Sequence, residues 1–590
     1  MTNIRTLTAG VDNFLGVPGD NNVFQFTPST LQATDTVTGA ATGGFFDVMV
    51  ATASGTIAAA QFTGVTNIEQ LFLSTGGNNV TLTNGLVAGS SFGSFVVIDN
   101  GGSDVIDASA VSSTPIVYYA GAGADTFIGG QGNDAVFFAP ANLSSADTIQ
   151  GGTGIDAFSF NAAGTAAASA FTSVTGFEIL NLSSAGNNVT LNNGFAASSS
   201  TGYLAITDGG GNDTVNASAV SATTIVFFAG AGADTFTGGS GNDAFFVAAT
   251  DLNAVDTFQG GLGLDNLYFT TGGTVGPTAL TNVTGVEAVV LNGLGNSVTL
   301  TNTLVGGSDN GALAVAGGAG NDSVDASGVT NGGTIAFLAS GGADTFRGGN
   351  GTNIYSFAPT DLTSADTVQG GAIDILLLNT AGTLAASAFT NVTGIETLSL
   401  ANGTNNVTLT DGLVGGSSFG FFVVRDGTGN DTVDGSGVTG TAIAFFGTNG
   451  GNETFTGGGG NDSFLFGGGQ LTAADTVAGG GGLDTLWMTT AGTTSTADLA
   501  GVSGIEGVFL QNGGTFSLAD GITAAARIVA TGSAAVDTID ASAVTGYGVV
   551  FTGNGGADVL LGGNQDDTFR IADSAFAIID GMPAPPTASP

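Results

Sequence analysis

Aspartates recur beside glycine-rich turns along this 590-residue sequence. The segment Gly238-Gly-Ser-Gly-Asn-Asp-Ala-Phe-Phe fits the nonapeptide G-G-x-G-x-D-x-U-x, in which U is a large apolar residue, and full matches also begin at Gly129 and Gly457. Glycines allow positive φ angles and turn backbone carbonyls toward a common centre, while the aspartate adds a hard anionic oxygen. Two such turns, stacked, supply about six oxygens, a set that suits Ca²⁺ better than Mg²⁺ or a soft metal.

The carboxylates form two series with a spacing of about 22 residues. Asp213, Asp234 and Asp256 belong to the first acid series. Asp243 and Asp265 belong to the second acid series. Both series recur in every long repeat of the chain, so we interpret them as columns on a regularly wound backbone.

The elements that must position these acids follow from a longer period. The glycine-rich turn recurs around Asp125, Asp234, Asp344, Glu453 and Asp558, at separations of about 109 residues. Short apolar segments lie between Gly/Asn/Asp turns and predict strands, which must stack to bury their apolar faces. The sequence therefore predicts an all-β, right-handed parallel β-solenoid of the β-roll or β-helix kind. It has coils of about 22 residues and five long repeats of about 109 residues.

The domain organisation follows the same periodicity. Residues 1–34 are predicted to be a partial repeat, residues 35–571 a continuous solenoid, and residues 572–590 a tail that is an export signal or a linker. The tail is rich in proline and is expected to break the repeat without continuing its strands. No helix is expected, because even the most helix-like segment, Ala166–Phe171, fits better as a loop that crosses a coil.

The nonapeptides resemble the repeats-in-toxin (RTX) calcium-binding β-roll of proteins exported by Gram-negative type I secretion. The composition is most similar to that of RTX-type S-layer proteins of alphaproteobacteria. The resemblance implies several bound Ca²⁺ ions, folding triggered by extracellular calcium, and an uncleaved C-terminal export signal. It implies these calcium ligands: Asp125, Asp134, Asp156, Asp234, Asp243, Asp265, Asp344, Asp462, Asp484, Asp558 and Asp567. The two acid series extend the predicted ligands to these: Asp104, Asp147, Asp213, Asp256, Asp322, Asp366, Asp374, Asp431, Glu453, Asp475 and Asp537.

Several positions depart from the RTX pattern. Asn353 replaces a motif aspartate, Glu453 replaces another, and the turn that begins at Gly562 lacks the third glycine. A β-roll coil holds two nonapeptides, about 18 residues, so a spacing of about 22 predicts a mixed solenoid that is wider than the standard roll. Two alternatives stay open. The Gly-Asn-Asp turns could act only as turn formers with asparagine ladders. The glutamates that continue the second acid series are either further ligands or exposed acids: Glu178, Glu287, Glu396 and Glu506.

Composition excludes several classes of function. Five arginines, no lysine and 47 acidic residues give a net charge of −42, which argues against nucleic acid and anionic membranes as partners. The absence of Cys and His removes thiolate sites, Ser–His triads and zinc-protease sites. The N-terminus lacks a signal-peptide pattern, and no run of about 18 apolar residues could span a membrane. Export is therefore expected to leave the N-terminus intact.

These observations predict a secreted, non-enzymatic, extracellular protein at the cell surface. We expect it to be stabilised by calcium and to assemble with itself, end to end, into a surface layer or a filament. A second candidate function is a biofilm-matrix adhesin that binds glycans or surfaces, with cell-surface polysaccharide as its partner. A more remote one is ice binding by a regular Thr/Asn face.

Overall fold

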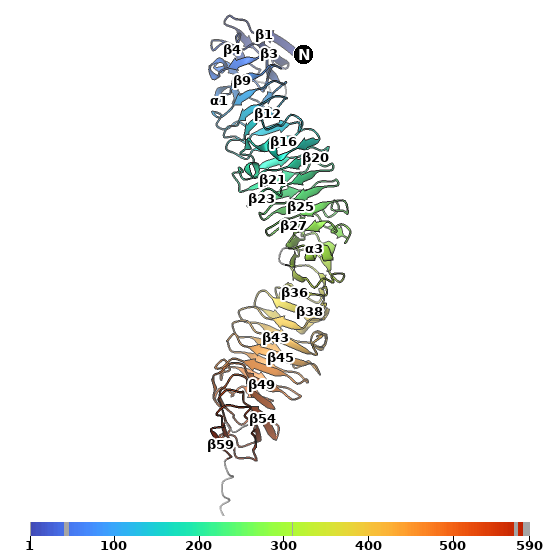
Figure 1. Ribbon diagram of the computed structural model, residues 1–590, viewed down its shortest axis with the longest axis vertical. Helices are drawn as coiled ribbons and strands as arrows, with labels where there is room; N and C mark the ends of the chain where they lie inside the picture. Colours follow the sequence, from blue (N-terminus) through green and yellow to red (C-terminus); the bar gives the residue numbers. More distant parts are fainter. Residues whose placement is uncertain (1, 41–45, 309–310, 572–575, 582–590) are drawn as a thin grey trace, which may run out of the picture. The chain divides into compact units, whose positions relative to one another are not determined.

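The computed structural model describes residues 2–40, 46–308, 311–571 and 576–581. The chain forms two compact units, one comprising Met1–Val290 with Gly307–Asn310 and the other Leu291–Gly306 with Gly311–Pro590. Each unit is a parallel β-solenoid, as the sequence predicts, and within each unit the strands stack rung upon rung (Figure 1). No helix among the described residues is long and apolar enough to cross a membrane.

The widest face of each solenoid is a parallel sheet, here called the main sheet. Along its strands buried and half-buried residues alternate, so that in β25 (Ala244–Val247) Phe245 and Val247 point into the core while Phe246 points outward. In the first unit the other strands of this sheet are β1 (Thr2–Thr6), β3 (Asn21–Phe26), β5 (Asp47–Ala51), β8 (Gln70–Phe72), β10 (Phe95–Ile98), β12 (Ile116–Tyr119), β14 (Ala135–Phe138), β16 (Ala157–Phe160), β19 (Ile179–Asn181), β21 (Tyr203–Thr207), β23 (Thr224–Phe228), β27 (Asn266–Phe269) and β30 (Ala288–Val290). In the second unit they are β32 (Ala312–Ala316), β34 (Thr334–Leu338), β36 (Thr352–Phe357), β38 (Ile373–Leu378), β41 (Thr397–Ser399), β43 (Phe421–Arg425), β45 (Ala442–Gly447), β47 (Ser463–Phe466), β49 (Thr485–Met488), β52 (Gly507–Leu510), β54 (Arg527–Thr531), β56 (Gly548–Thr552) and β58 (Thr568–Arg570).

Shorter strands form the remaining faces of the coils and also pair in parallel. In the first unit they are β2 (Asn13–Leu15), β4 (Thr36–Thr38), β6 (Gly55–Ile57), β7 (Val65–Thr66), β9 (Asn78–Thr81), β11 (Val105–Asp107), β13 (Thr126–Ile128), β15 (Thr148–Gln150), β17 (Gly164–Ala166), β18 (Val174–Thr175), β20 (Asn187–Thr190), β22 (Thr214–Asn216), β24 (Thr235–Thr237), β26 (Thr257–Gln259), β28 (Gly273–Val275) and β29 (Val283–Thr284). In the second unit they are β31 (Asn296–Thr299), β33 (Ser323–Asp325), β35 (Thr345–Arg347), β37 (Thr367–Gln369), β39 (Thr383–Leu384), β40 (Val392–Thr393), β42 (Asn406–Thr408), β44 (Thr432–Asp434), β46 (Thr454–Thr456), β48 (Thr476–Ala478), β50 (Thr493–Thr494), β51 (Val502–Ser503), β53 (Gly514–Ser517), β55 (Asp537–Asp540), β57 (Val559–Leu561) and β59 (Ile578–Asp580).

Stacked aromatic rings fill the core between these faces. Phe245 of β25 stacks on Phe227 of the coil before it, with ring centroids 5.0 Å apart, and on Phe258, at 5.4 Å. Phe236 stacks on both Phe227 and Phe258. All four rings are at most 1% exposed, so each coil buries its aromatic residues only by contact with its neighbours.

The strand register gives the length of each coil. The step on the main sheet from Val117 to Ala135 is about 18 residues, the length of a β-roll coil, and we call a coil of this length a short coil. The widest coil of the same long repeat runs from Ile179 to Ala205, and the coils between these two have the predicted spacing of about 22 residues. Each long repeat therefore combines one short coil with wider coils, which confirms the predicted mixed solenoid. Further short coils begin at Val226 and Ile335.

The few helices are single turns that lengthen particular coils. The four-residue helix α2 (Asn193–Ala196) lies in the widest coil, between Ile179 and Ala205, and the Asn192 side chain caps it by accepting a hydrogen bond from the Phe195 N–H. The others are α1 (Asn84–Val87), α3 (Asn302–Gly306) and α4 (Asp411–Val414), with 3₁₀ turns η1 (Ala59–Phe62), η2 (Ala168–Phe171) and η3 (Ala386–Phe389). The segment Ala166–Phe171, expected to be a loop, thus ends in a 3₁₀ turn.

The start of the C-terminal tail differs from the prediction. Residues 576–581 are the described part of the segment 572–590, and within it β59 pairs in parallel with β57. The expectation that the tail does not continue the strands was therefore wrong for Ile578–Asp580. The prolines follow only after this strand, so they do not interrupt its hydrogen bonds.

Candidate metal centre

Both acid series lie inside the turns that precede the strands, and hydrogen bonds join their members from coil to coil. In the first acid series the Asp104 N–H donates to Asp125 Oδ1 at 2.9 Å, and the Asp125 N–H donates to Asp147 Oδ1 at 2.8 Å. In the second the Asp134 N–H donates to Asp156 Oδ1 at 2.6 Å, and the Asp156 N–H donates to Glu178 Oε2 at 2.8 Å. Each carboxylate therefore accepts the backbone N–H of the preceding coil, and this arrangement repeats along both units.

The predicted ligands are almost fully buried. All of them except Asp567, which is half-buried, are at most 2% exposed. Carboxylates buried to this degree are costly unless they are paired, hydrogen-bonded or coordinated. The backbone N–H that each carboxylate accepts compensates part of the cost of burial. In many of these acids the second carboxylate oxygen still needs a partner.

Eight of these second oxygens have no hydrogen-bond donor among the described residues: Asp104 Oδ2, Asp125 Oδ2, Asp156 Oδ2, Asp213 Oδ2, Asp344 Oδ2, Glu453 Oε1, Asp484 Oδ2 and Asp537 Oδ1. Burial raises the pKa of Asp156, Asp344 and Glu453 to about 7, because the ionised form is desolvated and lies close to other acids. These orphaned oxygens are the positions that a bound cation would satisfy.

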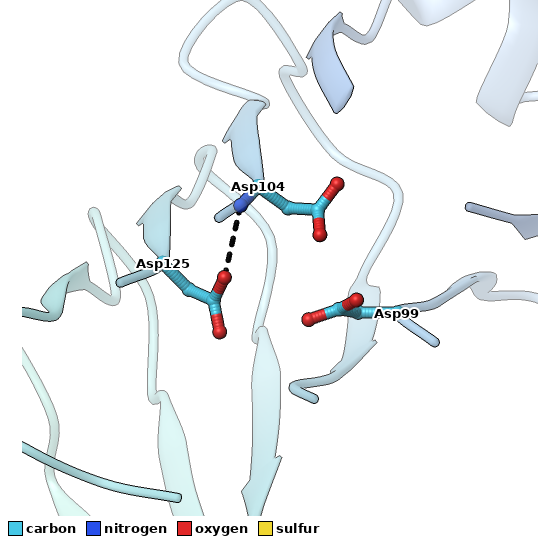
Figure 2. A group of neighbouring side chains, drawn as sticks. All are labelled: Asp99, Asp104 and Asp125. Carbon is cyan, nitrogen blue, oxygen red and sulfur yellow. Dashed lines mark hydrogen bonds between the residues drawn. The ribbon is translucent and has the colours of Figure 1, made fainter. Parts of the chain in front are cut away.

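Three aspartates converge in the first unit (Figure 2). Asp99 follows β10, Asp104 precedes β11 and Asp125 precedes β13, and one carboxylate oxygen of each lies within 4.8 Å of the others. Asp99 closes its own turn by accepting the Gly101 N–H at 2.6 Å, and its second oxygen accepts the Gly121 N–H of the next coil at 2.7 Å. We call this group the first three-aspartate cluster.

The electrostatics of this cluster point to a cation. Burial and the neighbouring Asp99 raise the pKa of Asp104 to about 8, and burial raises the pKa of Asp125 to about 6. The Tyr118 hydroxyl is fully buried without a donor or acceptor among the described residues, and burial with the nearby Asp125 and Asp99 raises its pKa. A hard divalent cation would neutralise these acids and use their free oxygens, as Ca²⁺ does with carboxylate ligands.

A second three-aspartate cluster repeats this geometry in the following long repeat. Asp208, Asp213 and Asp234 approach within the same 4.8 Å limit. Asp208 accepts the N–H groups of Gly210 at 2.7 Å and Gly230 at 2.9 Å. Burial raises the pKa of both Asp213 and Asp234 to about 7, with Asp208 as a further cause.

Asp99 and Asp208 were not among the ligands predicted from the sequence. Each lies five residues before a predicted ligand, where the nonapeptide has its first glycine. The signal was a third copy at the same spacing, since Asp426 precedes Asp431 by five residues. In that copy the Asn449 side-chain amide donates to Asp426 Oδ1 at 3.0 Å, so an amide supplies part of the compensation there.

Other predicted ligands have hydrogen-bond donors at both oxygens. The motif aspartate Asp134 accepts the N–H groups of Ile116 and Gly130, each at 2.7 Å, and so fastens its own turn to the coil before it. Asp147, the last predicted ligand in its part of the first acid series, accepts the Asp125 N–H and the Ser144 N–H. The corresponding acids Asp243, Asp256, Asp366, Asp462 and Asp475 share these two patterns.

The remaining predicted ligands occupy the same two columns. Asp322 and Asp431 accept backbone N–H groups from the coil before and from their own turns. Asp265, Asp374 and Asp558 stand at the equivalent positions of later coils, and Asp567 receives the Val549 N–H at 2.7 Å.

The glutamates of the second acid series are not surface acids. Glu178 and Glu396 are 2% exposed, Glu287 is 9% exposed, and Glu506 is half-buried. Glu178 Oε1 accepts both the N–H and the hydroxyl of Ser200 at 2.8 Å. The alternative that these glutamates are exposed acids was therefore wrong, and they act as hydrogen-bond acceptors between coils.

Comparison with known proteins agrees with this geometry. Five segments match the family described as the RTX calcium-binding nonapeptide repeat (4 copies): residues 117–139, 226–249, 337–356, 448–470 and 549–570. No curated protein matches the chain. Each matched segment overlaps one of the short coils, which begin at Val117, Val226, Ile335, Ala444 and Val550. The buried turns, the coil length and these matches together show that the chain carries RTX calcium-binding nonapeptide repeats at its short coils.

Proposed function

We propose that this protein is secreted, that calcium stabilises it, and that it assembles with copies of itself outside the cell into a surface layer or a filament. The observation that carries the proposal is the set of buried carboxylate oxygens without donors, distributed over both units. Such a chain is expected to fold fully only where calcium is abundant. Extracellular calcium is abundant, and RTX repeat proteins are typically secreted.

A column of exposed apolar side chains supports self-association. Ile155 and Leu264 in the first unit each precede an acid of the second series and are 53% and 56% exposed. Phe46, 42% exposed, precedes Asp47, whose N–H donates to Glu69 as the Asp156 N–H donates to Glu178. Ile373 and Leu483 repeat the position in the second unit, at 48% and 66%. Within a unit the column recurs every five coils, roughly 24 Å apart. A second copy of the chain carries the same spacing, so the apolar side chains of two copies can meet one another in register.

The proposal includes no catalytic role. The carboxylates recur with the repeat, and most of them accept backbone N–H groups, as structural ligands do. A glycosidase would need one asymmetric pair of acids with different environments.

Electron microscopy and sedimentation of the purified chain, with calcium and with chelator, test the proposal. We expect ordered assemblies in millimolar calcium, and their loss when Ile155, Leu264, Ile373 and Leu483 are changed to Ser together. Leu294→Ser is the matched control, because Leu294 is 81% exposed and lies outside the column. Monodisperse monomers in millimolar calcium would contradict self-assembly, and strand content unchanged by chelator would contradict stabilisation by calcium.

A further inference from the structure

An aromatic column lines the outer face of the main sheet in the second unit. Strand register places one residue of each of five consecutive strands in this column, namely Arg425, Phe446, Leu465, Trp487 and Phe509. All of these side chains point away from the core, since each is half-buried or exposed while its neighbours along the strand are buried. The face therefore presents large side chains at the spacing of strands, roughly 4.8 Å, and Leu465 separates Arg425 and Phe446 from Trp487 and Phe509.

A groove runs beside this column. Its floor is made of smaller residues in the adjacent register, including Val423, Ala444 and Ser463. Phe421, which is 42% exposed, bounds it on the other side. The groove has a volume of about 590 Å³, within the range of small-molecule sites.

Trp487 lines the groove, and a hydrogen bond and a stacking contact hold its ring in place. The Trp487 indole N–H donates to Thr485 Oγ1 at 2.9 Å, and its ring stacks on Phe509 with centroids 4.2 Å apart. Because Phe509 covers one face of the Trp487 ring and the indole N–H is already satisfied, the opposite ring face and the ring edge are what a ligand in the groove meets. Asn461 and Gln511 add amide groups to the lining.

A cation stands at one end of the column. The Arg425 guanidinium lies 5.0 Å from the centroid of the Phe446 ring, and the side chain is exposed. Arg425 is one of only five basic residues in a chain with 47 acidic ones. An exposed arginine beside a row of aromatic rings favours a ligand that is flat, hydroxylated and anionic.

We propose that this groove binds an acidic oligosaccharide. A pyranose ring offers an apolar C–H face that packs on an aromatic ring, and its length along an extended chain is close to one strand spacing. Because Leu465 lies between Phe446 and Trp487 in the column, these two rings are two strand spacings apart, and alternate sugar rings can lie on them, with hydroxyl groups toward Asn461 and Gln511. A uronate carboxylate pairs with Arg425, whose planar guanidinium matches it in geometry.

The first unit offers a natural comparison. Phe228, Phe246 and Tyr268 form an outward stack there, with centroids 5.0 and 4.5 Å apart. The position that corresponds to Arg425 is Thr207, which pairs with Phe228 as Arg425 pairs with Phe446. This stack has the aromatic surface without the cation, so we expect it to bind acidic saccharides weakly.

The only tryptophan of the chain reports directly on this groove. The probe is a hexasaccharide of alternating glucuronate and N-acetylglucosamine, titrated in millimolar calcium while Trp487 fluorescence is recorded. We expect a saturable change in fluorescence, about tenfold weaker binding in Arg425→Gln, and unchanged binding in Arg347→Gln, which removes an exposed arginine elsewhere in this unit. By calorimetry, Trp487→Ala should lose saccharide binding, whereas Trp487→Phe should keep part of it.

Several results would overturn this proposal. Equal affinity for a neutral glucose hexasaccharide would remove the role of Arg425, and so would binding that Arg425→Gln leaves unchanged. Trp487 fluorescence that changes with protein concentration, without saccharide, would assign the groove to a second copy of the chain. Circular dichroism in calcium confirms that each variant is folded. Because assembly is followed separately by microscopy, failure of saccharide binding leaves the proposed assembly standing.

Discussion

The substitution Asp99→Asn tests whether the first three-aspartate cluster holds a cation. Two carboxylate charges at the 4.8 Å limit of this cluster repel by about 3.5 kcal/mol at an effective dielectric constant of about 20. The amide removes that repulsion, but its NH₂ group cannot accept the Gly121 N–H, a loss of about 1.5 kcal/mol. Since Asp99 also repels the second neighbouring carboxylate of the cluster, the variant without calcium should gain at least about 2 kcal/mol of stability.

The assay is thermal unfolding of the full chain, followed by circular dichroism at pH 9, where Asp104, with a pKa of about 8, is ionised. A unit of about 290 residues has an unfolding entropy of about 0.6 kcal/mol/K, so 2 kcal/mol raises the Tm in chelator by about 3 °C. In calcium the variant lacks one anionic ligand. Each tenfold loss of affinity reduces the calcium-induced rise in Tm by about 2 °C.

Asp99→Asn is thus expected to raise the Tm in chelator and to reduce the calcium-induced rise in Tm. These opposite signs distinguish a metal site from a turn cap. Asp107→Asn is the matched control, because Asp107 caps the turn at Ser109 in the same region and lies outside the cluster. We expect it to lower the Tm slightly and equally with and without calcium. If Asp99→Asn behaves in the same way, Asp99 only closes its turn and the assignment of the cluster to a cation is wrong.

Three further predictions rest on the same geometry. In chelator the Tm should fall as the pH rises from about 4 to about 8, because the pKa of Asp104 is raised to about 8 and the folded state binds this proton more tightly than the unfolded state. Millimolar calcium should abolish the fall in Tm. A Tm that does not change with pH in chelator would contradict this prediction. Gly317→Asp should add one calcium equivalent by calorimetry, because the new acid would join Asp322 and Asp344; a Cβ there lies 3.3 Å from the Leu338 carbonyl oxygen, which must shift by a few tenths of an ångström. An unchanged stoichiometry would count against the assignment of three neighbouring acids to one cation. Phe245→Ala should lower the free energy of unfolding by about 3–5 kcal/mol in denaturant unfolding, whereas Phe246→Ala on the outer face should lower it much less. Equal losses of stability would contradict the assignment of Phe245 to the core and Phe246 to the outer face.

The regular spacing of the acids could be predicted from the sequence because it equals the mean length of coils that differ in length. The short coil that starts at Val117 and the widest coil, which starts at Ile179, together span two average coils. The acids of each series step mostly across the coils of intermediate length, so they show the average and not the extremes. Unequal coils depend on where a helical turn such as α2 is inserted, and this four-residue segment has no sequence signal strong enough to predict a helix.

The burial of the acids was predictable in outline, whereas the three-aspartate clusters were not. Regular spacing indicated that Asp104 and Asp125 share a column, but it could not indicate which oxygen accepts the backbone N–H of the preceding coil. Asp99 was not predicted as a ligand because the motif has glycine at its position and because the third long repeat has Gly317 there. Its role depends on the turn at Gly101 and on the approach of Gly121, where a Cβ would lie 2.7 Å from Asp99 Oδ2.

The position of the first three-aspartate cluster within the long repeat has a physical reason. In a solenoid each coil is stabilised by its own contacts and by its two interfaces. The short coil has the fewest residues with which to bury apolar area. Asp125 lies on this coil, while Asp99 and Asp104 lie on the coil before it. A cation held by all three would strengthen the interface of the coil to which apolar burial contributes least, and the same logic applies to Asp208, Asp213 and Asp234 at the next short coil.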